Sequence, residues 1–149
     1  MSIARWALGA VAAGVVLSAV EARAGNVSLR AGAYTDVDSA FVGIEYRAPL
    51  QGRLYVAPNF ELAFPGDGSY FSFNADMHYV FPAQGKLSPW LGAGLGIYSR
   101  SHDGSGSDTT AGANFIGGLG LRTQLQPYAQ VKIVVKGDTA FVLGFGIRF

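Results

Sequence analysis

The sequence has 149 residues, of which 50% are hydrophobic, 14% are charged and 21 are glycine. This length suits a single domain, but a typical soluble domain has about 25% charged residues. The formal net charge is only +1, and lysine and arginine form no run, so we expect no nucleic-acid-binding surface. The sequence has no cysteine, which excludes disulfides and thiolate metal or redox sites.

Residues 1–24 have the pattern of a secretory signal peptide. Arg5 supplies the positive charge at the start, residues 6–20 are apolar or small, and Ala22-Arg23-Ala24 matches a cleavage site. The apolar stretch is shorter than the roughly 20 residues that a membrane-spanning helix needs. We therefore predict that the signal peptide is cleaved and that residues 25–149 form one β-barrel domain.

After residue 24, apolar and polar residues alternate with a period of two, which indicates β-strands with two different faces. The clearest case is 70–81, where Phe71, Phe73 and Met77 alternate with polar residues such as Asn74. Turn residues (Gly, Pro, Asp and Ser) separate the alternating segments, and the longest connection is expected at 101–111. The eight predicted strands cover approximately 26–34, 40–48, 53–63, 69–81, 88–100, 112–123, 127–135 and 140–149.

Two opposite barrels fit eight alternating antiparallel strands: a soluble barrel with a polar exterior, or a membrane barrel with a polar interior. The low charge content favours the membrane barrel, because the soluble one would present Gly92, Gly94 and Gly96 to water. Opposite charges can pair inside a membrane barrel, whereas one charge at mid-depth on the lipid face costs about 2–4 kcal/mol. The predicted interior polar network contains Arg30, Glu45, Arg47, Arg53, Glu61, Asp76, His78, Arg122, Lys132 and Arg148.

Aromatic residues gather near the ends of the predicted strands, as in the interfacial girdles of membrane barrels. We expect one girdle at Tyr46, Phe81 and Trp90, and the other at Phe41, Phe71, Phe115 and Phe141. The glycines at 92–96 and 117–120 lie within strands and no helix follows them, so a nucleotide-binding loop is not indicated. Glycine at these positions leaves room for large interior side chains.

The chain resembles the small eight-stranded outer-membrane β-barrel proteins of Gram-negative bacteria, the OmpA- and OmpX-type group. The resemblance covers nearly all of 25–149 and depends on 88–96, 126–132 and 141–149. It implies an all-β, eight-stranded antiparallel up-and-down transmembrane β-barrel in the cell outer membrane, with both termini in the periplasm and 101–111 outside. It also implies that the last strand is an assembly signal read by the barrel-assembly machinery, through Phe145, Ile147 and Phe149.

Several residues invite a catalytic or metal-binding interpretation. Glu61, Asp76 and His78 could form a site, but the generally polar interior of membrane barrels explains them more simply. Only two histidines are present, which excludes a three-histidine metal site. Ser101-His102-Asp103 has the residue types of a triad, but consecutive residues cannot adopt its geometry. We expect no enzymatic activity and no cofactor.

We expect a non-catalytic, monomeric barrel with a structural or surface-interaction role, in contact with membrane lipid and lipopolysaccharide. One alternative is a small channel that favours anions, because the predicted interior has more basic than acidic residues. An eight-stranded interior is normally filled by side chains, however. A second alternative is a lipid A-modifying enzyme, but the His-x-Ser motif that the resemblance implies for lipid A deacylases is absent.

Overall fold

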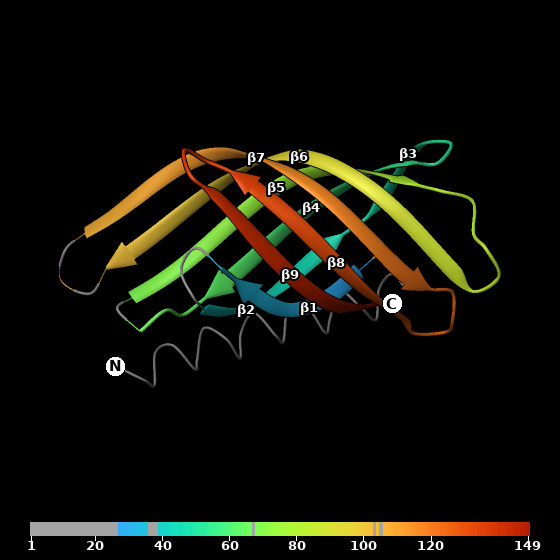
Figure 1. The fold of residues 1–149 in the computed structure, drawn as a ribbon, viewed down its shortest axis with the longest axis horizontal. Helices are drawn as coiled ribbons and strands as arrows, with labels where there is room; N and C mark the ends of the chain where they lie inside the picture. Colours follow the sequence, from blue (N-terminus) through green and yellow to red (C-terminus); the bar gives the residue numbers. More distant parts are fainter. Residues whose placement is uncertain (1–26, 36–38, 67, 103, 105) are drawn as a thin grey trace.

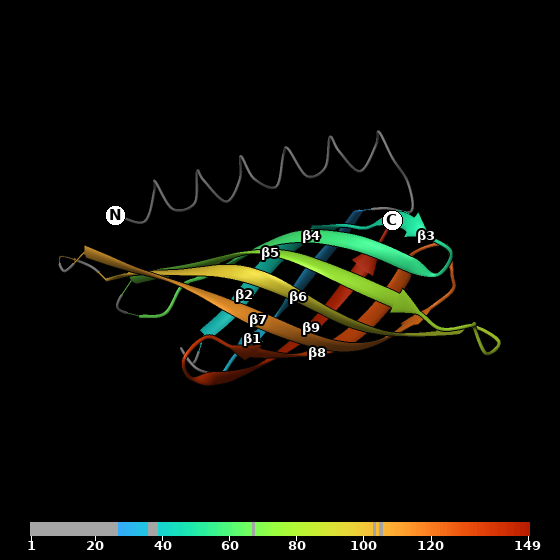
Figure 2. The same cartoon turned by 90° about the horizontal axis from the view of Figure 1, so that it is seen from above.

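The computed structural model describes residues 27–35, 39–66, 68–102, 104 and 106–149, which form an all-β closed barrel (Figures 1 and 2). The predicted signal peptide at 1–24 lies outside the described residues. Neighbouring strands are antiparallel, and the pairing of β2 with β4 closes the barrel. The strands in the described part of the chain are β1 (Val27–Tyr34), β2 (Ser39–Tyr46), β3 (Ala48–Gln51), β4 (Leu54–Ala63), β5 (Gly68–Val80), β6 (Leu87–His102), β7 (Gly106–Leu121), β8 (Gln126–Val135) and β9 (Thr139–Arg148).

The strands β2 and β3 are two parts of one barrel strand. β2 pairs with β4 as far as Glu45, and β3 continues this pairing in the same register at Ala48 and Pro49, before the register shifts between Pro49 and Gln51. The interruption lies at Arg47. In this register the preceding residue, Tyr46, faces Pro58 of β4, which has no backbone N–H to donate. The barrel therefore has eight strands, as predicted.

The alternation seen in the sequence becomes an inner and an outer face. Along β5, buried and exposed residues alternate almost throughout, with Asn74 and Asp76 buried and Phe73 and Met77 exposed. The exposed large side chains of the strands form what we call the apolar belt. It includes Val42, Phe71, Phe73, Met77, Tyr79, Leu91, Leu95, Ile97, Phe115, Leu119, Val131, Ile133, Phe141, Leu143, Phe145 and Ile147.

At one end of the barrel, β6 and β7 extend well beyond β8 and β9, and β5 stays paired with β6 up to His102. β6 and β7 have 16 residues each, and they remain paired up to His102 and Gly106. Their hairpin projects past the β8–β9 turn at the left of Figure 1. The prediction of a loop at 101–111 is wrong there, because β6–β7 pairing satisfies the backbone of this polar, glycine-containing segment.

The two ends of the barrel differ. Val27 and Phe149 lie at the end opposite the β6–β7 hairpin, where the Phe149 N–H donates to the Val27 carbonyl at 2.8 Å. We call these the terminal end and the hairpin end. Within the described residues, no helix is long and apolar enough to cross a membrane.

Candidate functional site

An ion-paired cluster fills the middle of the barrel, with Arg30 of β1 at its centre. The Arg30 guanidinium donates from Nε to Glu61 at 2.6 Å, from Nη1 to Glu45 at 3.2 Å and from Nη2 to Asn59 at 2.7 Å. All four side chains are buried. Two carboxylates and an amide oxygen therefore satisfy one buried guanidinium, as such a charge requires.

A third ion pair crosses the full width of the barrel. Lys132 Nζ of β8 lies 3.6 Å from the Glu61 Oε1 atom of β4. Three barrel strands separate β8 from β4 in either direction around the sheet, so these strands lie opposite each other. Both side chains are almost fully buried, and the Tyr34 hydroxyl also donates to Glu61. Side chains from opposite walls thus meet in the middle of the interior.

Three asparagines continue this network toward β6 and β7. The Asp76 carboxylate accepts from the side-chain amides of Asn59 at 2.7 Å and Asn114 at 3.0 Å. Asn74 donates to Asn59 at 3.0 Å and accepts from Asn114 at 2.7 Å. A Cβ added at Gly94 would overlap the Asp76 side chain. The prediction that these glycines make room for interior side chains is thus confirmed for Gly92, Gly94, Gly96 and Gly118, whereas Gly117 meets only Leu91 of the outer face.

The terminal end of the interior holds a cluster of cations and aromatic rings. The Arg47 guanidinium lies 4.9 Å from the Trp90 ring centroid, and that of Arg148 lies 4.8 Å from the Tyr128 ring centroid. Arg47 donates to His78 Nδ1, with Nη2 at 3.0 Å. Arg148 donates from Nη2 to Glu45 at 3.1 Å, which connects the cluster to Arg30.

The placement of Trp90 in an interfacial girdle is wrong, because its ring is buried inside the barrel. Trp90 shares its strand face with Gly92, Gly94 and Gly96, and this spacing was the available signal for an interior position. Phe41, placed in the other girdle, is likewise buried.

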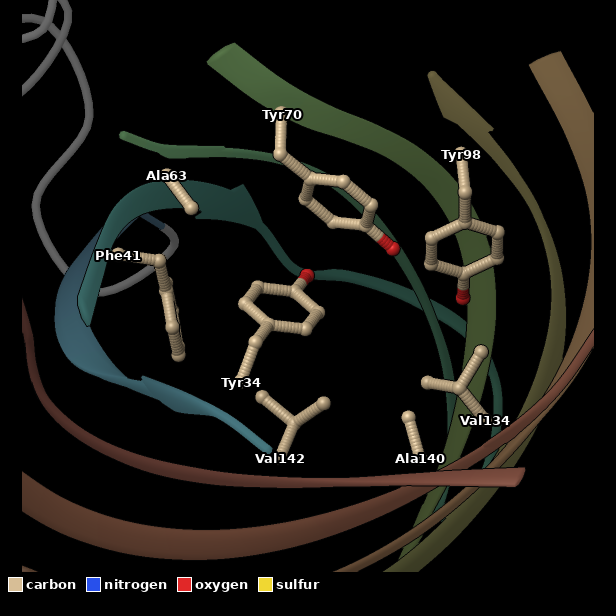
Figure 3. Close-up of a cluster of buried hydrophobic side chains, with 8 residues drawn as sticks. All are labelled: Tyr34, Phe41, Ala63, Tyr70, Tyr98, Val134, Ala140 and Val142. Atoms are coloured by element: carbon tan, nitrogen blue, oxygen red, sulfur yellow. The ribbon is translucent and has the colours of Figure 1, made fainter. Parts of the chain in front are cut away.

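Toward the hairpin end, the ionic cluster gives way to a hydrophobic layer. Figure 3 shows its side chains pointing into the barrel from both walls. The Tyr34 ring packs edge-on against Phe41 and Tyr70 at centroid distances of 5.0 and 5.1 Å. The layer consists of Tyr34, Phe41, Ala63, Tyr70, Tyr98, Val134, Ala140 and Val142. Its position means that the interior is closed by apolar packing as well as by ion pairs.

Eight of the ten residues predicted for the interior network are buried there: Arg30, Glu45, Arg47, Glu61, Asp76, His78, Lys132 and Arg148. Arg53 and Arg122 are not, and the prediction is wrong for both. Arg53 lies in the turn before β4, and Arg122 directly follows the end of β7. Both side chains are exposed at the terminal end, because these positions lie beyond the paired strands where inward and outward faces are defined.

No known protein-family profile matches the chain, and neither does any curated protein. Several solved structures do match it. The N-terminal β-barrel domain of Pseudomonas aeruginosa OprF has a TM-score of 0.64 at 20% identity, over 85% of this chain and 98% of that one. Neisserial surface protein A (NspA) has a TM-score of 0.58 at 18% identity, over 83% and 92% of the two chains. This chain has the fold of the eight-stranded outer-membrane β-barrels.

The resemblance noted in the sequence is therefore confirmed at the level of the fold. The same comparison also matches the outer membrane enzyme PagL, with a TM-score of 0.53 at 16% identity, over 83% of this chain and 98% of that one. An outer membrane enzyme is thus among the proteins with this barrel, and the fold leaves the activity of this chain open.

Candidate metal ligands and triad residues do not assemble in the described part of the chain. That part contains no group of three or more His, Cys, Asp or Glu side chains placed to hold a metal ion. Ser101 and His102 lie at the end of β6 in the hairpin, and Asp103 lies outside the described residues.

The residues predicted as the assembly signal lie on or beside the last strand. Phe145 and Ile147 are 58% and 41% exposed, and Phe149 is half-buried at the terminal end. β9 pairs with β1 from Arg148 to Val142, so the last strand of the chain lies beside the first described strand. Their role in assembly remains a prediction.

Proposed function

We propose that this chain is a non-catalytic, non-conducting barrel of the Gram-negative outer membrane, with a structural and surface-interaction role. The observation that carries this proposal is the contact between Lys132 and Glu61 across the full width of the interior. Export by a signal peptide, insertion by the barrel-assembly machinery and a monomeric state belong to the same proposal.

The apolar belt supports a membrane location. Of the charged residues in the described strands, only Asp108 is exposed, and it lies in the hairpin. One lysine or arginine at mid-depth on the lipid face would cost about 2–4 kcal/mol, so this distribution suits a hydrocarbon surrounding. Membrane lipid and lipopolysaccharide are the proposed contacts of the belt.

The interior supports a closed barrel rather than an anion channel. With Arg53 and Arg122 outside, four buried basic side chains face three buried carboxylates: Arg30, Arg47, Lys132 and Arg148 against Glu45, Glu61 and Asp76. The interior therefore has only one more positive than negative side chain, and the anion-channel alternative depended on this excess. The ion pairs and the hydrophobic layer fill successive depths of the same interior.

Planar-bilayer recording tests this closed state. We expect no unitary conductance steps from purified protein that shows the gel mobility shift on boiling typical of a folded barrel. A detergent extract from cells that lack the chain controls for contaminating porins. Reproducible steps that require the folded protein would establish the channel instead.

The projecting β6–β7 hairpin supports the surface-interaction part. Residues 106–111 of β7 pair with β6, whereas β7–β8 pairing begins at Ala113. This segment is polar and exposed, as a surface in water requires. An epitope inserted after Gly104 should be labelled by antibody on intact cells, and one inserted at Gln51 should require permeabilised cells. The opposite result would reverse the orientation.

The lipid A-modifying alternative has one direct test. We expect an unchanged lipid A mass spectrum when the chain is expressed, compared with cells that carry the empty vector. Loss of an acyl chain from lipid A, dependent on the folded barrel, would replace the non-catalytic proposal.

A further inference from the structure

A polar cavity of about 180 Å³ opens at the hairpin end, directly above the hydrophobic layer. Tyr70 and Tyr98 of that layer form its floor, and both are buried. The extended β6–β7 sheet forms one wall and the β8–β9 turn forms the other. A role for this cavity goes beyond the proposed closed barrel, which gives it no part in conduction.

The β8–β9 turn holds two opposite charges at the cavity. Lys136 Nζ lies 3.7 Å from the Asp138 carboxylate, and 5.8 and 6.0 Å from the ring centroids of Tyr70 and Tyr98. Gly137 between them has φ of +103°, a conformation that favours glycine. The Lys136 N–H donates to the Asp138 carbonyl at 3.0 Å, which fixes this tight turn.

The wall formed by β6 and β7 carries a second pair of opposite charges. Arg100 of β6 and Asp108 of β7 are direct partners in the antiparallel register, and both line the cavity. Partners in such a register have Cβ atoms about 4.5–5.5 Å apart. Each wall therefore presents one cation and one carboxylate, and the formal charge of the cavity is zero.

This combination suits a small neutral ligand that has several hydroxyl groups. A guanidinium offers parallel donors and a carboxylate offers two acceptors, so each matches two neighbouring hydroxyls. The buried rings of Tyr70 and Tyr98 close the bottom of the cavity, so the charged side chains of the walls are the groups that would contact the ligand. The cavity is also smaller than the about 300–1,000 Å³ of pockets for drug-sized ligands. We propose that it binds a single pyranose-type sugar, either free or as the terminal residue of a surface glycan.

Ligand-observed NMR on the full-length protein, in a detergent without a sugar head group, tests this proposal. The probes are the methyl glycosides of glucose, galactose and mannose, with glycine as a zwitterion and a sulfated hexose as an anion. We expect at least one neutral glycoside to bind more tightly than glycine and the sulfated sugar. Absence of neutral-sugar binding, or tighter binding of either charged probe, would overturn it.

Matched variants test whether the sugar binds in this cavity. Arg100→Gln and Lys136→Met remove cavity cations, and Arg53→Gln and Lys86→Met make the same changes at exposed positions of the terminal end. We expect the dissociation constant of the sugar to rise at least about tenfold in the cavity variants, because charged hydrogen bonds are lost. The control variants should bind the sugar as tightly as the parent protein. Equal effects in both pairs would place the sugar elsewhere and refute the proposal.

A second variant separates binding from folding. The Asp138 side chain is 66% exposed, so Asp138→Asn should retain the gel mobility of the folded barrel. It should still weaken sugar binding, and unchanged affinity would argue against the cavity. Comparing the methyl glycoside with the same sugar at the end of a purified polysaccharide distinguishes the two sources of ligand.

Discussion

The inner and outer faces of this barrel alternate residue by residue, yet they are packed by different rules. Gly117 and Gly118 are neighbours on β7, and a Cβ added at Gly117 would meet only a methyl carbon of Leu91 at 3.7 Å. A Cβ added at Gly118 would overlap the Trp90 ring. The inner face is thus packed like a protein core, whereas lipid can adapt to the outer face. Changes on the inner face should therefore cost far more than equivalent changes elsewhere.

The largest effect is expected for Glu61→Gln. Glu61 is 1% exposed and accepts from Arg30 at 2.6 Å, with Lys132 at 3.6 Å, so its loss leaves two buried cations under-compensated. Breaking a buried ion pair typically costs about 3–5 kcal/mol, and urea unfolding in lipid vesicles measures this loss. Asp138→Asn is the control, because the Asp138 side chain is 66% exposed and water screens its pairing with Lys136, so we expect a loss of about 0–1 kcal/mol. Similar losses for both variants would contradict the role assigned to the interior pairs.

The second-largest effect is expected for Gly118→Ala, which tests the difference in packing between the inner and outer faces. Gly118→Ala forces the Trp90 ring to move and should destabilise the barrel by about 1–3 kcal/mol, the usual cost of overpacking. Gly117→Ala changes the adjacent residue in the same way but has space on the outer face. The unfolding free energies of both variants should differ by at least 1 kcal/mol. Equal values would mean that Trp90 is not packed as described.

Deletion of Phe149 should have a small effect on stability and a larger one in cells. A fully buried phenylalanine contributes about 1.5–3 kcal/mol, and Phe149 is only half-buried. If this residue is an assembly signal, the variant should refold in detergent nearly as well as the parent protein. Its folded amount in the outer membrane, measured by gel mobility of membrane fractions, should nevertheless fall. Normal membrane levels would argue against the signal.

The smallest effects are expected for Arg53→Gln and Arg122→Gln. Both side chains are exposed beyond the strand ends, where most substitutions change stability by less than about 0.5 kcal/mol. Arg30→Gln removes the same charge from the buried network and should cost several times more. If Arg53→Gln or Arg122→Gln lowered the unfolding free energy as much as Arg30→Gln, that arginine would belong to the interior network after all.

Much of this architecture could be predicted from local patterns. A two-residue period assigns each strand residue to a face, and scarce charge indicates which face is outside. This reasoning placed Arg30, Glu61 and Lys132 inside correctly. It failed for Arg53 and Arg122, because a period cannot tell where a strand ends and its faces cease to exist.

The sequence by itself determined the number of strands, the apolar belt and the residue types available for the interior, because these follow from periodicity and composition. Only the tertiary structure decided which side chains meet. Lys132 and Glu61 are far apart in sequence and pair because eight strands close into a circle. Trp90 and Phe41 lie inside because facing glycines and partner rings accommodate them. The hairpin extends through 106–111 because backbone pairing with β6 outweighs the weak strand preference of a Gly- and Asp-containing segment.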